Sequence, residues 1–227
     1  MKQELRHRFH AELEDLERII GEVGTLAEQA VRRSVEALVR RDRDLAEQVI
    51  AGDDEIDDHY LDVEKRVLDL LALQTPVASD LRMVSAIMHI NLHLERVGDM
   101  AVNIAKIARA TRTLPTSPVI LSHLEEMAAL VGRMVLTAID AFERRDLELC
   151  LTLPEMDDPV DVLNRGMYAE VVKLADDPAL LEWGVSMNVV ARQLERVGDH
   201  AVDIAEQVGF LLTGEFREFT DASHDVV

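Results

Sequence analysis

The chain has 227 residues, and its 44 Asp and Glu outnumber its 24 Lys and Arg to give a formal net charge of −20. This acidic excess excludes a protein that binds nucleic acid through the phosphates, because such binding needs a surplus of basic side chains, and it disfavours unaided contact with an anionic membrane surface. The hydrophobic share of 48% excludes a disordered acidic tail and is enough for a buried core.

Helix patterns run through the whole chain, whereas strand and hairpin patterns are nearly absent. Pro76 disfavours helical geometry in the residue before it and so separates two of the expected helices. Asp158 followed by Pro159 is typical of a helix start, which predicts a break near 154–158. In chain order, we expect helices over 4–41, 43–73, 77–111, 119–144, 147–175 and 179–212.

The sequence contains one pattern twice. LERVGDMAVNIA over 94–105 returns as LERVGDHAVDIA over 194–205, and DDEID over 53–57 resembles DDPVD over 157–161. Apolar residues in both long segments recur with alternating steps of three and four, which is the pattern of one buried helix side. Short connections make neighbouring helices antiparallel. We therefore expect an all-α fold of two tandem antiparallel three-helix bundles, 1–112 and 113–214, with a flexible tail over 215–227.

Each repeat carries acidic or amide side chains at positions i, i+4 and i+8 of its last helix, which places them on one stripe of that helix. Like charges at this spacing repel, so helix stability alone does not favour them. Folding each bundle at its last turn brings acidic residues of the preceding helix to the same level. The candidate metal ligands are Glu95, Asp99, Asn103, Asp54, Asp57 and Asp58 in the first repeat, and Glu195, Asp199, Asp203, Asp157, Asp158 and Asp161 in the second.

Several carboxylates at one level of a helix pair are suited to hard or borderline cations, which favours iron, manganese, magnesium or calcium and leaves zinc open. The alternative is a solvated acidic face, partly neutralised by Arg96 and Arg196. Gly98 and Gly198 interrupt otherwise strong helices. They fit either a close approach by a neighbouring helix or a metal, or ordinary packing at a small residue.

The remaining residues indicate no enzyme. His93 and His200 are each interpreted as a single imidazole with a surface or packing role. Cys150 is the one cysteine, which excludes an internal disulfide and a thiolate metal site. The sequence has no phosphate-binding loop, dinucleotide fingerprint or nucleophile elbow. It also has no apolar signal core and no run of about 18 uncharged apolar residues. We therefore expect a cytoplasmic protein without membrane insertion.

The twice-written LERVGD block resembles the PhoU family, and QTPVASDLRMVSAIMHI over 74–90 resembles the segment that precedes the block in that family. The resemblance covers nearly the whole chain, in both halves. It implies a duplicated three-helix-bundle fold. It also implies iron or zinc clusters on Glu-x-x-x-Asp motifs, which are here Glu95 with Asp99 and Glu195 with Asp199.

Two departures between the halves limit this duplication. Asn103 in the first half matches Asp203 in the second, so the first site is expected to bind fewer ions. The second half has Glu182 and Trp183 where the first has the triplet Asp-Leu-Arg over 80–82, so a partner surface at that place need not be duplicated.

The resemblance further implies a negative regulator of phosphate uptake and of phosphate-starvation signalling. Such a protein is an adaptor between the Pst phosphate ABC transporter, through its ATPase subunit, and a PhoR-type sensor histidine kinase. The sequence leaves open whether the chain forms a homodimer. A rival hypothesis is a metal-buffering or metal-storage bundle that needs no protein partner, and a third is a plain structural bundle without metal.

Overall fold

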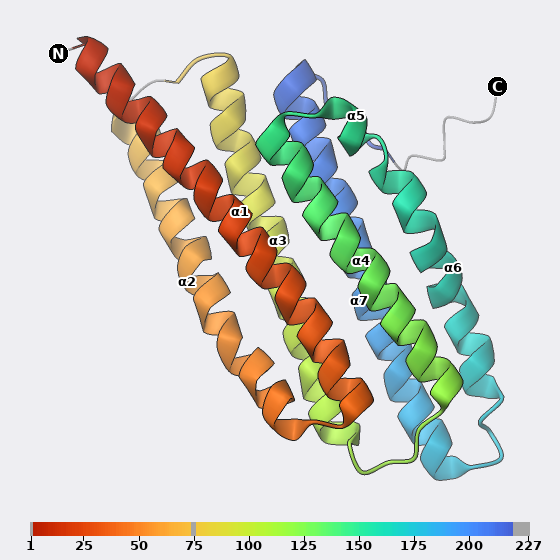
Figure 1. Ribbon diagram of the computed structural model, residues 1–227. Helices are drawn as coiled ribbons and strands as arrows, with labels where there is room; N and C mark the ends of the chain where they lie inside the picture. The colour runs from red at the N-terminus through yellow and green to blue at the C-terminus, as the bar shows by residue number, and fades with distance from the viewer. Residues whose placement is uncertain (1, 74–75, 220–227) are drawn as a thin grey trace, which may run out of the picture.

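The computed structural model describes residues 2–73 and 76–219. Helices are the regular elements within these two ranges, as the sequence predicts. Six of them are long, and α5 is a single turn (Figure 1). In chain order they are α1 (Lys2–Arg40), α2 (Arg43–Leu73), α3 (Ser79–Thr111), α4 (Pro118–Arg144), α5 (Leu147–Cys150), α6 (Leu153–Val172) and α7 (Pro178–Thr213).

Charged turns of the same sequence follow α1 and α4. Arg41 and Arg145 both adopt a left-handed backbone, each with a φ of 56°. The next residues, Asp42 and Asp146, accept a hydrogen bond from the backbone N–H three residues further on, at 3.0 and 3.1 Å. Each bond satisfies one of the free donors at the start of the following helix. The internal repeat is therefore present in the turns as well as in the helices.

The middle helix of the second half is interrupted at 151–152, before the expected 154–158. Pro154 stands in the first turn of α6, where a missing N–H costs little. Pro159 lies inside α6 on its exposed side, and burial of the adjacent Val160 holds the helix in place through it. The expected position of the break was wrong because an exposed Pro does not end a helix whose other face is packed.

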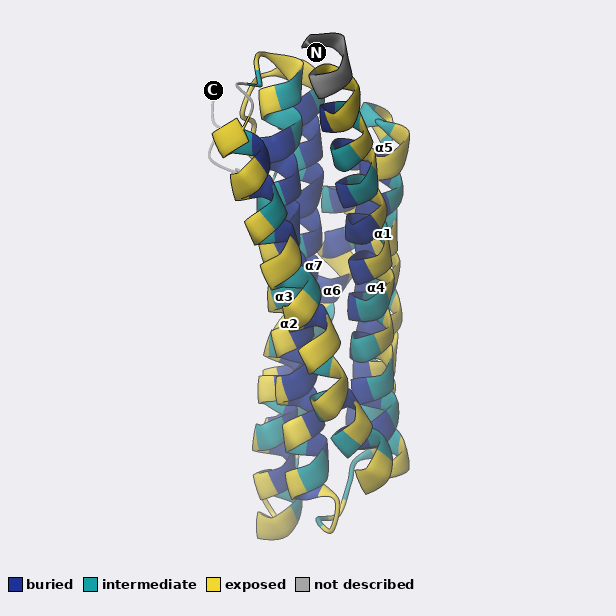
Figure 2. Cartoon of the chain, turned by 90° about the vertical axis from the view of Figure 1, so that its left-hand side faces the viewer, coloured by how far each residue is buried: buried dark blue, intermediate teal, exposed yellow. Residues whose placement is uncertain are grey.

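The helices form two antiparallel three-helix bundles that lie side by side. α1, α2 and α3 pack together, as do α4, α6 and α7. α3 also packs along α7, and α1 packs along α4. In Figure 1, α3 and α7 run in opposite directions, and all the long helices follow the long axis of the molecule (Figures 1 and 2). The all-α fold of two bundles is confirmed.

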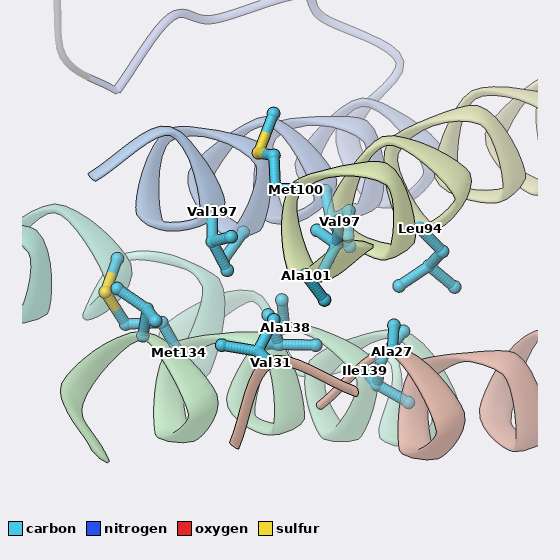
Figure 3. Close-up of a cluster of buried hydrophobic side chains, with 14 of the residues drawn as sticks. Ala27, Val31, Leu94, Val97, Met100, Ala101, Met134, Ala138, Ile139 and Val197 are labelled. Carbon is cyan, nitrogen blue, oxygen red and sulfur yellow. The ribbon is translucent and has the colours of Figure 1, made fainter. Parts of the chain in front are cut away.

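One continuous hydrophobic core extends through both halves. The apolar residues that recur by three and four along α3 and α7 are buried, as the sequence predicts. Val97 and Ala101 of α3 lie beside Val197 of α7, with Val31 of α1 and Ala138 of α4 on the other side of the core (Figure 3). Full burial of such an aliphatic side chain contributes about 1.5–3 kcal/mol. A shared core of this kind predicts that the halves unfold together.

The first part of the expected tail packs against α7. The ring of Phe216 stacks on that of Phe210 with centroids 3.9 Å apart, and the backbone N–H of Phe219 donates to Glu206 at 2.6 Å. Residues 215–219 thus have packing contacts, the flexibility of the tail stays a prediction, and residues 220–227 lie outside the described residues. No helix in the described ranges is both long and apolar enough to cross a bilayer.

Candidate metal centres

In the first half, carboxylates of α2 face carboxylates of α3. Asp53 is the centre of this first acidic cluster, since burial first and then three neighbouring carboxylates raise its pKa to about 6. Those neighbours are Asp57 on α2 and Asp99 and Glu95 on α3. Burial, together with Asp99 and Asp57, also raises the pKa of Glu95, against the opposing charge of Arg96.

Gly98 makes this approach possible. A Cβ at this position would lie 3.0 Å from Oδ1 of Asp53 and 3.1 Å from Cδ1 of Ile56, which is tighter than ordinary contact. Of the two interpretations of this glycine, close approach by a neighbouring helix is the one the structure supports. The approaching groups are the carboxylate of Asp53 and the side chain of Ile56, so the glycine serves both the acidic cluster and the packing of α2 on α3.

The second half repeats the arrangement with deeper burial. Asp157 of α6 is 9% exposed, and burial first, then Asp199, Asp161 and Asp158, raise its pKa to about 6. Gly198 again makes room, because a Cβ there would lie 2.5 Å from Oδ1 of Asp157. We call Asp157, Asp161, Glu195 and Asp199 the second acidic cluster, and Asp53, Asp57, Glu95 and Asp99 the first.

Within the part of the chain that the structure describes, three buried carboxylate oxygens of these clusters have no hydrogen-bond partner. They are Oε2 of Glu95, Oδ1 of Asp157 and Oε2 of Glu195. A buried polar atom without a partner costs free energy, and a buried charge costs more. A cation bound by these oxygens would remove that cost. The donor set of each cluster therefore fits an oxygen-bound metal ion.

Different arginines approach the two clusters. Arg96 lies 3.4 Å from Oε2 of Glu95 and 3.5 Å from Oδ2 of Asp99, as expected. In the second half, Arg192 pairs with Glu195, whereas Arg196 forms no ion pair with any described residue. Both arginines directly follow the glutamate of their repeat, so the register does not cause the difference; in the second half it is Arg192, one turn earlier, that pairs with Glu195.

The structure brings together most of the predicted ligands and separates the others. Those in the two acidic clusters are Asp57, Glu95, Asp99, Asp157, Asp161 and Asp199. Glu195 is counted with the second cluster because it lies one turn before Asp199 on the same stripe of α7. Those on exposed helix faces are Asp54, Asp58, Asn103 and Asp158, although the charge of Asp158 still acts on Asp157. Asp203 lies in a different group, with His93 and His200.

Sequence reasoning missed Asp53. The internal repeat could have found it, because the match of DDEID over 53–57 with DDPVD over 157–161 pairs Asp53 with Asp157. The carboxylates also stand further apart than bound ligands do. Within the described residues, the one group of three potential ligand atoms that all lie within 4.8 Å of one another is that of His93, His200 and Asp203.

A duplicated, antiparallel helical bundle with a carboxylate cluster between the second and third helices of each half is a distinctive class of protein. The model of the PhoU domain matches residues 20–108 and again residues 124–208. The chain belongs to the PhoU family.

Several relatives cover nearly the whole chain. It is 35% identical, over 91% of its length and 90% of the relative's, to the phosphate-specific transport system accessory protein PhoU homolog of Caulobacter vibrioides. It is 34% identical, over 97% and 89%, to the protein of the same name from Pseudomonas aeruginosa.

Two solved structures share the fold. The crystal structure of PhoU from Pseudomonas aeruginosa has a TM-score of 0.86 at 35% identity and covers 91% of this chain and 100% of that one. The phosphate transport system regulatory protein PhoU from Streptococcus pneumoniae has a TM-score of 0.83 at 28% identity, over 92% and 99%.

Proposed function

We propose that this protein is an accessory regulator of a phosphate-specific transport system. The observation that carries the proposal is the similarity, over nearly the full length of both chains, to proteins with that name. Both halves match the PhoU domain, so the whole duplicated bundle, and not one half, would be the working unit. The proposed role is non-catalytic and consists of binding other proteins.

In this proposal the protein acts in the cytoplasm as a negative regulator. It links the ATPase subunit of a Pst-type ABC transporter to a PhoR-type sensor histidine kinase and keeps both silent when phosphate is plentiful. The long helices offer exposed faces for such contacts. α2 and the segment just after it expose four large apolar side chains, namely Leu61, Leu68, Leu73 and Val77. Leu61 and Leu68 are about two helical turns apart and so lie on one face of α2, and exposed apolar patches are typical of protein interaction sites.

The proposal assigns metal ions to the two acidic clusters. Asp53, Asp57, Glu95 and Asp99 would hold ions in the first half, and Asp157, Asp161, Glu195 and Asp199 in the second. The proposed ions are iron or zinc, as the family resemblance implies, with manganese, magnesium and calcium as the alternatives that oxygen-only donor sets suit. A bound ion would neutralise local negative charge and fix α2 against α3 and α6 against α7, which would make each acidic face a defined surface for a partner.

The test of the regulatory role is deletion of the gene in its own host. We expect phosphate-transporter expression to stay high in phosphate-rich medium, and the wild-type gene to restore repression. Normal repression in the deletion strain would refute the role. If repression is normal and the purified protein carries many exchangeable ions, the metal-buffering function is the better account.

A second experiment tests the docking surface. The double substitution Leu61→Gln and Leu68→Gln changes two residues on one face of α2, since seven residues are about two helical turns. We expect this variant to fold normally and to lose co-purification with the transporter ATPase. The matched control is Val162→Gln on α6, because Val162 is also an exposed apolar side chain but lies in the other half. Unchanged co-purification of the double variant would exclude the α2 face.

A further inference from the structure

Two histidines and one aspartate meet where the two halves join. His93 lies on α3, and His200 and Asp203 lie one turn apart on α7. The Nδ1 atoms of the histidines are 3.0 Å apart. Oδ2 of Asp203 lies 3.5 Å from Nδ1 of His93 and 3.4 Å from Nδ1 of His200. Three potential ligand atoms thus form a nearly equilateral triangle, contributed by both halves.

This group is not part of the duplication. Moving by the 100-residue repeat, the positions equivalent to His93, His200 and Asp203 hold Gln193, Met100 and Asn103. These three differences between equivalent positions therefore fall on residues that are neighbours in space. Separate roles as isolated surface or packing residues do not explain why all three ligand-type residues occur at one place and none at the other.

The triangle has the size of one face of a zinc coordination tetrahedron. Ligand atoms bound at about 2.0–2.1 Å in tetrahedral geometry are about 3.3 Å from one another. The three observed separations, 3.0, 3.4 and 3.5 Å, lie around this value. We propose that His93, His200 and Asp203 form a binding site for a single divalent transition-metal ion of the zinc type, with the fourth position left for water or another ligand.

The surroundings suit such a site. The side chains of His93 and His200 are 17% and 18% exposed, and that of Asp203 is 43% exposed, so an ion would enter from the side of the carboxylate. The donor set of two imidazoles and one carboxylate separates this site from the two oxygen-only clusters, since imidazole favours zinc, copper and nickel.

The site would have a structural consequence. Its ligands come from α3 and α7, which pack against each other across the boundary between the halves. An ion held there would therefore tie one bundle to the other, whereas an ion in either acidic cluster would tie helices within one bundle.

The test uses the whole chain after removal of metals with a chelator, titrated with Co²⁺ as a spectroscopic probe and with Zn²⁺ as competitor. We expect one equivalent of Co²⁺ to give the intense visible bands of a four-coordinate N/O site, and Zn²⁺ to remove them. The substitutions His93→Gln and His200→Met each install the residue found in the other repeat. Each is expected to weaken this one equivalent by about 100-fold or more, since even the loss of an outer partner costs 10–100-fold.

His89→Gln is the matched control, because His89 lies one turn before His93 on α3 but is exposed and bonds to Ser85 of its own helix. This variant should bind Co²⁺ as the wild type does. Asp157→Asn should also keep the visible bands, since its change falls in an acidic cluster. The proposal is overturned if the wild type gives no four-coordinate spectrum, or if the two histidine variants fold normally and retain it. Both outcomes would leave a plain imidazole hydrogen bond as the explanation, and neither depends on phosphate regulation.

Discussion

The two acidic clusters share one sequence block but differ in depth. Asp157 and Glu195 of the second cluster are 9% and 7% exposed, whereas their counterparts Asp53 and Glu95 are only partly buried. Among the described residues, the second cluster has two buried carboxylate oxygens without a hydrogen-bond partner, and the first has one, Oε2 of Glu95, which still lies 3.4 Å from Arg96. The twelve-residue block is nearly the same in both halves, so the surrounding helices cause the difference. We infer that the second cluster depends more on a bound cation than the first.

The largest expected effect concerns the cores of the two halves. Trp183 is 1% exposed, and Trp183→Ala should lower the free energy of unfolding by about 3–5 kcal/mol because it leaves a large cavity. The residue one repeat earlier, Met83, is only partly buried, so Met83→Ala should cost less than half as much. Urea unfolding followed by circular dichroism measures both. A single transition is expected in each case, and two separate transitions would contradict a shared core.

Metal content compares the clusters directly. Glu195→Gln with Asp199→Asn should remove the ions of the second half, and Glu95→Gln with Asp99→Asn those of the first. In the wild type, the cluster of the second half should bind metal more tightly than that of the first. Its double variant should therefore lose more affinity, about 100-fold or more by analogy with ligand-shell substitutions.

The measurement for these variants is elemental analysis of protein purified without chelator or nickel affinity resin. The control is Asp54→Asn with Asp58→Asn, which changes two exposed acids of α2 and should keep the wild-type stoichiometry. Equal metal content in all four proteins would exclude both clusters as metal sites.

The pH dependence of the metal-free chain tests the buried carboxyls. The pKa of Asp157 is raised to about 6, from about 4 in an unfolded chain, so the folded state binds the proton more tightly. Its contribution to stability is present below about pH 4 and is lost as the pH rises through about 6. Relative to Asp157→Asn, the wild type should lose about 1–2 kcal/mol over this interval, after allowance for solvent screening.

Urea unfolding in chelator, from roughly pH 3.5 to roughly pH 7.5, gives this difference, because the range includes the unfolded pKa of roughly 4 and the folded pKa of about 6. His93, whose lowered pKa acts in the opposite direction, is common to both proteins and cancels. Asp53→Asn should behave in the same direction, because the pKa of Asp53 is also about 6. Asp54→Asn is the exposed control. A flat difference for Asp157 would mean that its carboxyl is solvated in the folded chain.

The smallest effect concerns the arginines. Arg192→Gln removes the cation that pairs with Glu195 and should tighten metal binding in the second half. Arg96→Gln should do the same in the first half. Because such partly exposed ion pairs are worth about 0.2–1 kcal/mol, each gain should be about 1.4- to fivefold. Arg196→Gln is the control, and titration with Mn²⁺ measures all three. If only Arg196→Gln tightened Mn²⁺ binding, the cation acting on the second cluster would be Arg196 and not Arg192.

Much of the candidate site could be predicted because helices have a fixed period. The i, i+4 spacing alone places Glu95 with Asp99 on one stripe, and the short turn brings α2 back along α3. The choice between Asp53 and Asp54 could not be made in this way. Neighbouring residues of a helix are rotated by about 100°. The height of a residue along α2 therefore does not determine whether its side chain faces α3. The depth of Asp157 and the pairing of Arg192 depend on the same rotation.

The sequence by itself determined the helices, their buried sides, the duplication and the two acidic stripes, because all of these follow from local periodicity and from the repeat. The tertiary structure decided which acid of each helix enters the cluster, how deeply it is buried, and that His93 meets His200. That last contact joins residues of different halves. It depends on how one bundle packs against the other, and no spacing within a single helix carries this information.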